Sequence, residues 1–365
     1  MPRGRGVFAA AAALSVAAVL ALRPGESAQP WRETLYVFGT LVEIEIRGTA
    51  PETARAAGEA VARQLDAWHR DWHAWKPGAL DTLNRAIASG QAGRVDDTLL
   101  AVLDEGARLS CLSEGLFDPA IGNLIALWGF HEDIAPTGAP PAPDRIEALR
   151  RAAPDMGDLR VEGGAILSDN PAVALDLGGY AKGLALDLAG RILAASGIDN
   201  AVLNAGGDVN VLGHHDDRPW RVAIRDPFVW GAVAAIDMGG GEVLYTSGNY
   251  ERYFDHDGQR FAHILDPRTG WPVQDVVSVS VLADTGALAD AAATALSVAG
   301  DDWPRIAGRM GVDAVLLING DGTMAATPAM AARLDWLGET PAALRLIDPI
   351  PPAAAPDCSG LRRTL

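Results

Sequence analysis

Apolar and polar residues alternate with two different periods along this chain, which predicts strands and helices in turn. Residues 35–47 alternate with Val, Ile and Tyr and are interrupted at Gly39-Thr40, which is typical of two strands joined by a turn. Helical spacing appears at residues 53–72, 97–112, 180–196, 288–298 and 303–310. Further strands are expected at 165–175, paired around Asp169-Asn170, and at 201–204, 220–225, 233–238, 243–247, 261–265, 276–282 and 314–318.

The order of these elements predicts the fold class. Strands come in adjacent groups between helices, and no sequence repeat of fixed period is present. Such an order favours an α+β fold with largely antiparallel sheets and flanking helices.

The two ends of the chain differ from its middle. Arg3 and Arg5 precede an apolar run at residues 7–22, and Pro24-Gly25 follow, which predicts a signal peptide or an N-terminal membrane anchor over residues 1–29. We therefore expect an exported protein on the periplasmic side, with inner-membrane attachment if the leader stays uncleaved. Residues 30–349 are expected to form one folded domain, and the Pro/Ala-rich residues 350–365 a flexible tail.

Charge and cysteine content exclude some functions. The net charge is −17 and no Lys/Arg-rich run follows the N-terminal segment, which argues against nucleic-acid binding. An acidic protein that binds a polyanionic ligand needs a cation to offset repulsion. Cys111 and Cys358 lack the spacing of a metal-thiolate site. A disulfide between them would need an oxidising compartment, and the expected mobility of the tail argues against it.

Two segments in the second half carry the most informative chemistry. Residues 263–272 place His263, Pro267 and Gly270 in a short loop after a strand, and Pro and Gly fix such a loop in a defined shape. Asp290 and Thr294 are four residues apart in an Ala-rich helix, so both oxygens project from one face. That pair suits Mg²⁺ bound near a phosphate. Taken singly, His263 would more commonly be a core histidine with its hydrogen bonds satisfied. Asp290 and Thr294 would more commonly be a solvated acid and a helix hydroxyl.

Three polar or Gly-rich turns accompany these segments. At residues 176–183 a strand runs into a helix, and Lys182 adds a positive charge to a helix N-terminus that already favours anions. This turn matches neither a P-loop nor a Rossmann motif, and an ordinary tight turn is the alternative. Residues 204–208 form a second such turn. Residues 247–252 are polar, and Arg252 would bind an anion or form a structural ion pair.

Taken in order, seven segments resemble the FAD:protein FMN transferase family, also called ApbE-like. The resemblance implies a T-fold-like α+β fold with FAD in a cleft and Mg²⁺ at its pyrophosphate. It also implies transfer of FMN to a Thr or Ser hydroxyl through a phosphodiester, with release of AMP. The matching segments are residues 38–40, 116–122, 176–183, 204–208, 247–250, 263–272 and 289–294.

The resemblance also assigns residues and partners. Expected acceptors are flavin-carrying subunits of membrane redox complexes, such as sodium-pumping NADH:quinone oxidoreductase. His263 and Asp290 take catalytic positions, with His263 as a general base or an orienting group. Phe38 and Trp75 stand where the family often has Met and Tyr. The expected metal ligands are Asp290 and Thr294 with carbonyls near Gly179 and Ala287, and the expected FAD contacts are Phe38, Trp75, Leu116, Phe117, Asp118, Asp176, Lys182, His263 and Ile264.

Other functions remain open at this point. The same site would serve a Mg²⁺-dependent FAD pyrophosphatase that yields FMN and AMP, with water in place of the acceptor. A flavin-binding or flavin-delivery protein without turnover is a second alternative, and the Asp290/Thr294 pair argues against it. A redox flavoenzyme is a third, and the lack of a nicotinamide-binding motif or paired reactive cysteines argues against that.

Overall fold

A computed structural model describes residues 29–131, 136–338, 341 and 343–364 of the chain. The expected leader lies outside the described residues, except for its last position. Within the described part, no helix is both long and apolar enough to cross a membrane.

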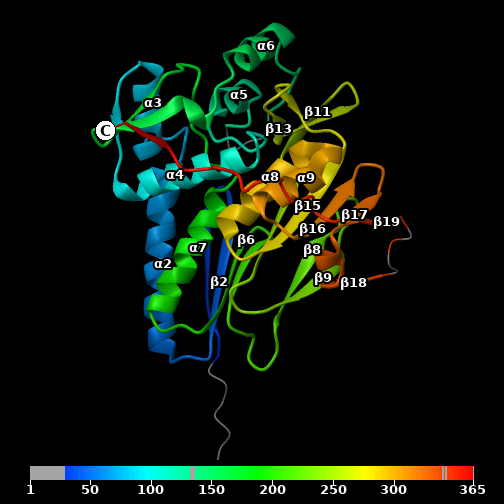
Figure 1. Cartoon of the computed structure of the whole chain (residues 1–365). Coiled ribbons are helices and arrows are strands. Elements are labelled where there is room, and N and C mark those ends of the chain that lie inside the picture. The colour runs from blue at the N-terminus through cyan, green and yellow to red at the C-terminus, as the bar shows by residue number, and fades with distance from the viewer. Residues whose placement is uncertain (1–28, 132–135, 339–340, 342, 365) are drawn as a thin grey trace, which may run out of the picture.

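A nine-stranded sheet forms the centre of the molecule (Figure 1). Each strand is antiparallel to its neighbour except at one edge, where β17 and β19 run parallel. The spatial order is β1 (Trp31–Val37), β2 (Thr40–Arg47), β6 (Asn200–Ala205), β7 (Asp208–Leu212), β10 (Val243–Gly248), β15 (Val276–Ala283), β16 (Ala314–Asn319), β17 (Met324–Ala326) and β19 (Leu344–Leu346).

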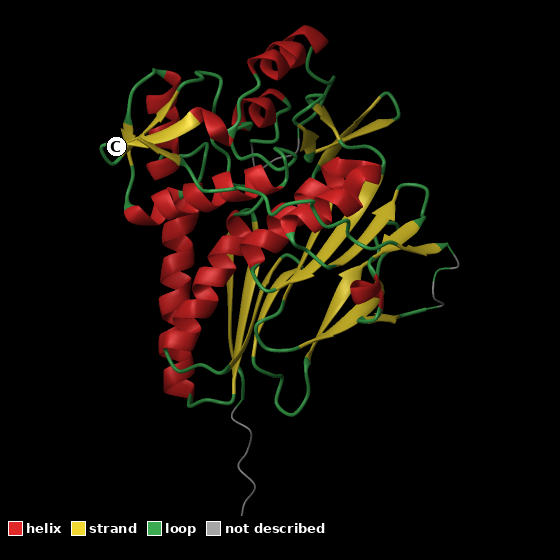
Figure 2. Cartoon of the chain, viewed as in Figure 1, coloured by secondary structure: helices red, strands yellow, loops and turns green. Residues whose placement is uncertain are grey.

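Four helices cover one face of this sheet (Figures 1 and 2). They are α2 (Pro51–Asp71), α7 (Ala181–Ala195), α8 (Gly286–Ala299) and α9 (Trp303–Met310). Helix α8 contacts β10 and β15 on one side and α7 and α9 on others, so it is buried almost all round. Its many alanines allow this close approach, because a small side chain lets neighbouring backbones come near.

A smaller sheet covers part of the opposite face. It contains β8 (Trp220–Arg225), β9 (Ala232–Met238) and β18 (Leu334–Trp336) in the order β18-β9-β8. Trp220, Ile236 and Leu316 belong to the apolar cluster between the two sheets. The short helix α10 (Pro328–Ala331) closes this layer with Met330.

The remaining elements gather at one end of the large sheet (Figure 2). They include a four-stranded sheet in the order β20-β4-β5-β3 and two hairpins. These elements are α3 (Ala79–Ala88), β3 (Gly93–Arg94), α4 (Asp97–Leu112), α5 (Gly122–Leu127), α6 (Pro143–Ala152), η1 (Met156–Asp158), β4 (Leu159–Glu162), β5 (Ala165–Ser168), β11 (Tyr253–His256), β12 (Gln259–Ala262), β13 (Leu265–Asp266), β14 (Trp271–Pro272), η2 (Gly300–Asp302) and β20 (Arg362–Thr364).

The α+β class with largely antiparallel sheets is confirmed, and most of the predicted helices and strands are present. The strand pair expected at 165–175 is wrong: only β5 forms, and its partners are β3 and β4. Residues 171–175 instead contact the loop before α5, as Ala174 accepts a hydrogen bond from Gly122 at 2.7 Å. Helices α3 and α6 were not predicted from the sequence.

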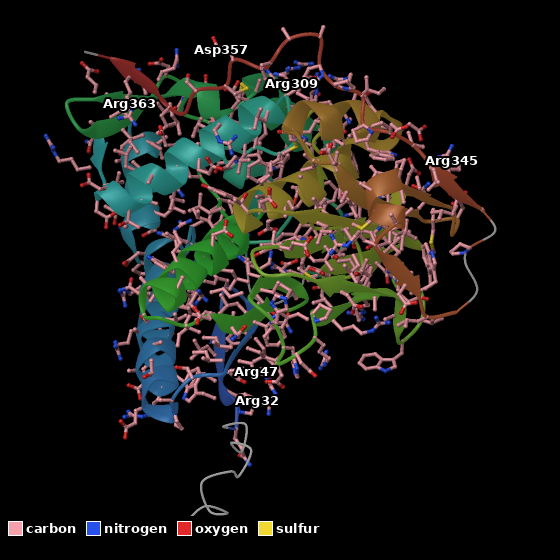
Figure 3. The ribbon with its side chains drawn as sticks, turned by 60° about the horizontal axis from the view of Figure 1, so that its bottom comes forward. Arg32, Arg47, Arg309, Arg345, Asp357 and Arg363 are labelled. Atoms are coloured by element: carbon pink, nitrogen blue, oxygen red, sulfur yellow. A yellow bond between two sulfur atoms is a disulfide. The ribbon has the colours of Figure 1, made fainter. Side chains whose placement is uncertain are left out.

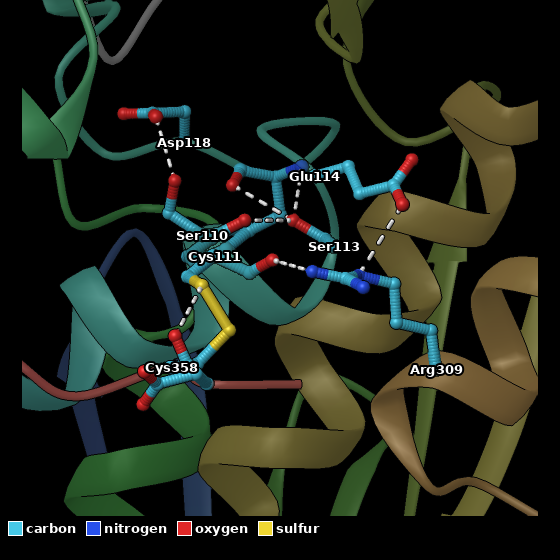
Figure 4. The surroundings of a disulfide bond; sticks show 9 residues. Ser110, Cys111, Ser113, Glu114, Asp118, Arg309 and Cys358 are labelled. Carbon is cyan, nitrogen blue, oxygen red and sulfur yellow. Dashed lines mark hydrogen bonds and ion pairs between the residues drawn. A yellow bond between two sulfur atoms is a disulfide. The ribbon is translucent and has the colours of Figure 1, made fainter. Parts of the chain in front are cut away.

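The C-terminal segment differs most from expectation. Cys111 and Cys358 form a disulfide, with 5.6 Å between their Cα atoms, so the prediction of unpaired cysteines is wrong (Figure 4). Leu361 is buried in the main core, and its N–H donates to Asp104 on α4 at 2.9 Å. Strand β20 then pairs in parallel with β4. Within the segment expected to be a flexible tail, residues 358–364 are therefore held against the body.

Candidate active site

An aromatic cleft lies beside the N-terminal end of α7. Phe38 takes a positive φ of 53° in the β1–β2 turn, and its N–H donates to His69 Nδ1 at 3.1 Å. Its ring packs edge-on against His69 at 5.7 Å and near Trp72 at 6.2 Å. The other side of the cleft has Trp75 against His131, with ring centres 5.4 Å apart. Stacked and edge-on rings of this kind offer planar apolar surfaces to a planar ligand.

The floor of the cleft is the turn that leads into α7. Trp75 Nε1 donates to Asp176 Oδ2 at 2.8 Å, and the N–H of Gly178 donates to Asp176 Oδ1 at 2.8 Å. Asp176 therefore joins the aromatic wall to the Gly-rich turn. Phe38, Trp75, Asp176 and Lys182, which the family resemblance assigns as ligand contacts, all line this one cleft, and the contacts themselves stay a prediction.

Lys182 stands between two buried carboxylates. Its ammonium lies 3.1 Å from Asp208 Oδ2 and 3.4 Å from Asp290 Oδ1. Asp290 Oδ2 also accepts the backbone N–H of Gly183 at 3.1 Å, and Asp208 Oδ1 accepts that of Thr246 at 3.0 Å. Three separate elements, α7, β7 and α8, thus meet at one charged cluster.

Burial and charge act in opposite directions in this cluster. Burial raises the pKa of the Asp290 carboxyl, and Lys182 opposes that rise. Burial favours a lower pKa for Lys182, but the charges of Asp208, Asp290 and Glu251 outweigh it and raise the pKa. Lys182 is therefore cationic at neutral pH and offers a fixed positive charge to a phosphate.

Thr294 and Asp290 face the same space from one side of α8. Thr294 Oγ1 lies 3.3 Å from Ser247 Oγ, and a Cβ atom built on Gly179 would come within 3.8 Å of it. The closest approach of the 176–183 turn to α8 is at Gly183, where an added Cβ atom would lie 2.1 Å from the Gly286 carbonyl oxygen, so only glycine fits there. The i, i+4 pair and the nearby turn are brought together as predicted.

The start of α8 is held by Asp187, a half-buried acid on α7. Asp187 accepts the N–H groups of Gly286 at 2.7 Å and Ala287 at 3.0 Å. Asn210 Nδ2 donates to the same carboxylate at 2.9 Å. Asp187 thus satisfies N–H groups that a helix N-terminus leaves unpaired, and it sets the position of Ala287 and Asp290.

The oxygens around α8 match the preferences of a hard cation. A carboxylate from Asp290, a hydroxyl from Thr294 and carbonyls near Gly179 and Ala287 are the types of ligand that Mg²⁺ selects. The contacts of Asp290 with Lys182 are long, 3.4 and 3.5 Å, and the carboxylate is only 4% exposed. Among the described residues no cluster of three or more His, Cys, Asp or Glu could hold a metal.

His263 lies at the side of the cleft where Arg252 stands. Its backbone N–H and its ring Nδ1 both contact the Arg252 carbonyl, at 3.0 and 3.2 Å. Since a carbonyl only accepts, Nδ1 carries the ring proton and Nε2 keeps a free lone pair. Burial, aided by the charge of Arg252, lowers the pKa of His263 to about 4, so the ring is neutral at pH 7.

The other predicted contacts lie beneath the cleft. Phe117 packs against Tyr180, with ring centres 5.4 Å apart, and Leu116 and Ile264 are buried in the core. Asp118 accepts hydrogen bonds from Ser110 Oγ at 2.7 Å and from the N–H of Ala120 at 2.8 Å. Its carboxylate is directed into the fold, so its side chain supports the loop. Ligand contact by residues 116–118 stays a prediction.

The structure adds residues that the sequence did not single out as site residues. Asp208 comes at the end of the Gly-rich turn at residues 204–208, and its carboxylate lies 3.1 Å from the Lys182 ammonium. Asp187 is one turn further along α7 than Gly183, and nothing in its local sequence distinguishes it. His69 and His73 also line the cleft, with their rings 5.8 Å apart. Their spacing of four residues around the end of α2 is the one sequence feature that links them.

Comparison with known proteins places this site in a family. The model of the ApbE family matches residues 38–316. A FAD:protein FMN transferase of Rhodobacter capsulatus is 56% identical over 329 residues, which cover 89% of this chain and 62% of that protein. One of Vibrio cholerae is 37% identical over 217 residues, which cover 59% of this chain and 64% of that protein. The chain thus spans less than two thirds of the length of these two relatives.

A solved structure agrees with the sequence comparison. The ApbE protein of Thermotoga maritima superposes with a TM-score of 0.76 at 28% identity, covering 84% of this chain and all of that one. The family match includes Phe38, Trp75, Asp176, Lys182 and Asp290, which the structure gathers around one cleft. On both counts the chain belongs to the ApbE family.

Proposed function

We propose that this chain is a Mg²⁺-dependent FAD:protein FMN transferase. The observation that carries the proposal is the meeting of the aromatic cleft with Lys182, Asp290 and Thr294. The cleft offers planar surfaces for the flavin, and the Lys182 end offers charge and backbone N–H groups for the pyrophosphate. The names of the relatives support the same activity.

The reaction forms one P–O bond and breaks another. A Thr or Ser hydroxyl of the acceptor attacks the phosphorus on the riboflavin side of FAD, and the bond to the AMP oxygen breaks. The hydroxyl proton passes to a base, and AMP leaves with the electron pair of the broken bond. FMN is then held to the acceptor by a phosphodiester.

Residues of this chain have separate roles in that scheme. His263 is positioned to take the proton at Nε2, since its ring is neutral at pH 7 and Nδ1 is engaged. Lys182 stabilises charge on the phosphates. Asp290 and Thr294, with carbonyls near Gly179 and Ala287, would hold Mg²⁺, which neutralises pyrophosphate charge when bound.

We further propose that the enzyme works outside the cytoplasm, on the periplasmic side, with inner-membrane attachment if the leader stays uncleaved. The disulfide between Cys111 and Cys358 supports this, because disulfides persist in oxidising compartments. The proposed acceptor is a flavin-carrying subunit of a membrane redox complex.

The test is to incubate the protein with FAD, Mg²⁺ and an acceptor domain, and to view a denaturing gel under ultraviolet light. A fluorescent acceptor band that disappears with chelator is the expected result. AMP release with a dark acceptor band would indicate FAD hydrolysis instead. If FAD binds but neither AMP nor labelled acceptor forms, the chain is a flavin binder and the proposal is wrong.

A further inference from the structure

A groove of about 440 Å³ lies between the large sheet and the free edge of the small one. Thr34 and Glu43 line it from the outer face of β1 and β2, and Val202 and Asn204 line it from β6. The facing wall is β8, represented by Ala223. This groove lies on the sheet face away from the helices, so it is separate from the cleft described above.

Strand β8 presents unpaired backbone groups to this groove. It is the edge strand of the sheet β18-β9-β8, and β9 is its partner within the described residues. Asp226, just after β8, donates its N–H to Gly231 on the β9 side. Backbone direction alternates along a strand, so the N–H and C=O of Ala223 and Arg225 point away from β9. A free edge of this kind can accept another strand.

Apolar residues are exposed where both walls of the groove continue. Tyr36 and Leu41 are paired across β1 and β2, two residues beyond Thr34 and Glu43, and are more than half exposed. On the other wall, β8 continues into the tip Phe228-Val229-Trp230, where Trp230 is 96% exposed. Exposed large apolar residues that gather in one area indicate an interaction surface.

The end of the groove near Tyr36, Leu41 and Trp230 is also the end that lies toward the active site. Gly207 lines the groove and directly precedes Asp208, the partner of Lys182. The guanidinium of Arg225 lies 5.1 Å from the centre of the Tyr250 ring, in the polar segment that continues to Arg252 of the cleft. The opposite end is marked by Arg32, which Figure 3 shows near Arg47 at the far end of the β1–β2 hairpin.

We infer that this groove binds an extended segment of the acceptor protein, which adds to β8 as a further strand. The inference rests on the proposed transferase function, since only a protein acceptor needs such a surface. A strand on β8 that runs toward Gly207 would lead its chain to the Lys182 cluster, with an apolar side chain against Trp230. Glu33, Glu43 and Glu45 outnumber the basic Arg32 and Arg221 in the groove, which disfavours an anionic membrane as the occupant.

The test compares two substitutions at one exposed position of β8. Ala223→Pro removes the outward N–H, and proline is tolerated on an edge strand because that N–H faces solvent. Ala223→Val keeps the N–H and suits a strand. The probe is the periplasmic flavin-carrying domain of a sodium-pumping NADH:quinone oxidoreductase subunit. Transfer is measured as the KM for this domain, beside FAD affinity and the rate at saturating acceptor. Trp230→Ala serves as a second variant, independent of backbone effects at β8.

We expect Ala223→Pro and Trp230→Ala each to raise the acceptor KM about tenfold, with FAD affinity and the saturated rate unchanged. Ala223→Val should match the wild type. Equal KM values for all four proteins would overturn the inference while leaving the transferase function intact. Loss of self-association in Ala223→Pro without a change in KM would also overturn it, because a second copy would then occupy the groove. If the wild type transfers no FMN, the proposed function itself has failed.

Discussion

The ammonium of Lys182 lies 3.4 Å from the carboxylate of Asp290, and this contact joins the first turn of α7 to α8. The two residues are 108 positions apart. One supplies a fixed positive charge and the other an oxygen ligand, so the contact brings a phosphate-binding charge next to the proposed cation site.

Replacing Asp290 by alanine should abolish transfer. The variant loses the only carboxylate among the proposed Mg²⁺ ligands, and we expect the rate at limiting Mg²⁺ to fall by about 100-fold or more. Ser297→Ala, in the same helix, is the matched control, since the Ser297 hydroxyl donates to the Ala293 carbonyl of its own helix at 2.8 Å. A normal rate for Asp290→Ala at limiting Mg²⁺ would show that the metal assignment is wrong.

Trp75→Phe should weaken FAD binding selectively. It keeps an aromatic surface but removes the 2.8 Å hydrogen bond to Asp176, so we expect the KM for FAD to rise about tenfold. Trp128→Phe is a matched control, because it removes a similar bond to the Gly270 carbonyl outside the cleft. Comparable KM values for both variants would contradict a role of Trp75 in the cleft.

Asp187→Asn should destabilise α8 and loosen the proposed cation site. An amide keeps one acceptor oxygen and replaces the other by NH2, so one of the two N–H groups, of Gly286 or of Ala287, loses its acceptor, and we expect about 2 kcal/mol loss in the free energy of unfolding. The affinity for Mg²⁺ should fall about tenfold. Urea unfolding and Mg²⁺ titration of the transfer rate measure the two effects. The exposed acid Asp321, changed to Asn, should alter neither, and an unchanged Asp187→Asn would refute this role.

The lowered pKa of His263 predicts a pH-dependent stability. Between about pH 6.5 and 4 the unfolded chain binds a proton on this histidine, whereas the folded protein does not. The free energy of unfolding should therefore decrease as the pH falls through this window. His263→Gln removes this contribution, so its unfolding free energy should depend less on pH between 7.5 and 5. Parallel pH profiles for the two proteins would contradict the assigned pKa.

Reduction of the disulfide should lower stability without stopping catalysis. The bond closes a loop of 247 residues, and loss of such a link typically costs about 2–5 kcal/mol. Cys111→Ser with Cys358→Ser should show a Tm below that of the oxidised wild type. Dithiothreitol should lower the Tm of the wild type alone. A transfer rate at 25 °C that falls with the Tm would mean that the segment also shapes the active site.

Local sequence patterns predicted those features that depend on neighbours in the chain. The Asp290/Thr294 pair follows from helical spacing, and Lys182 in the first turn of α7 follows from the Gly-rich turn before it. The resemblance to the family then indicated the cleft. Features that depend on distant pairing were not predictable in this way. Asp208 meets Lys182 only because β7 lies next to α7, and the acid Asp118 is turned inward by Ser110 and Met156.

The disulfide also affects how the chain reaches its native state. The sequence has two cysteines, so a single intramolecular pairing exists and no reshuffling among isomers is needed. Cys111 is synthesised long before Cys358, however, and its thiol must wait while almost the whole central sheet is added to the chain. During that interval a wrong disulfide can form only with another molecule, because the printed sequence offers no third cysteine. Crowding of nascent chains, rather than mispairing within one of them, then favours incorrect disulfides.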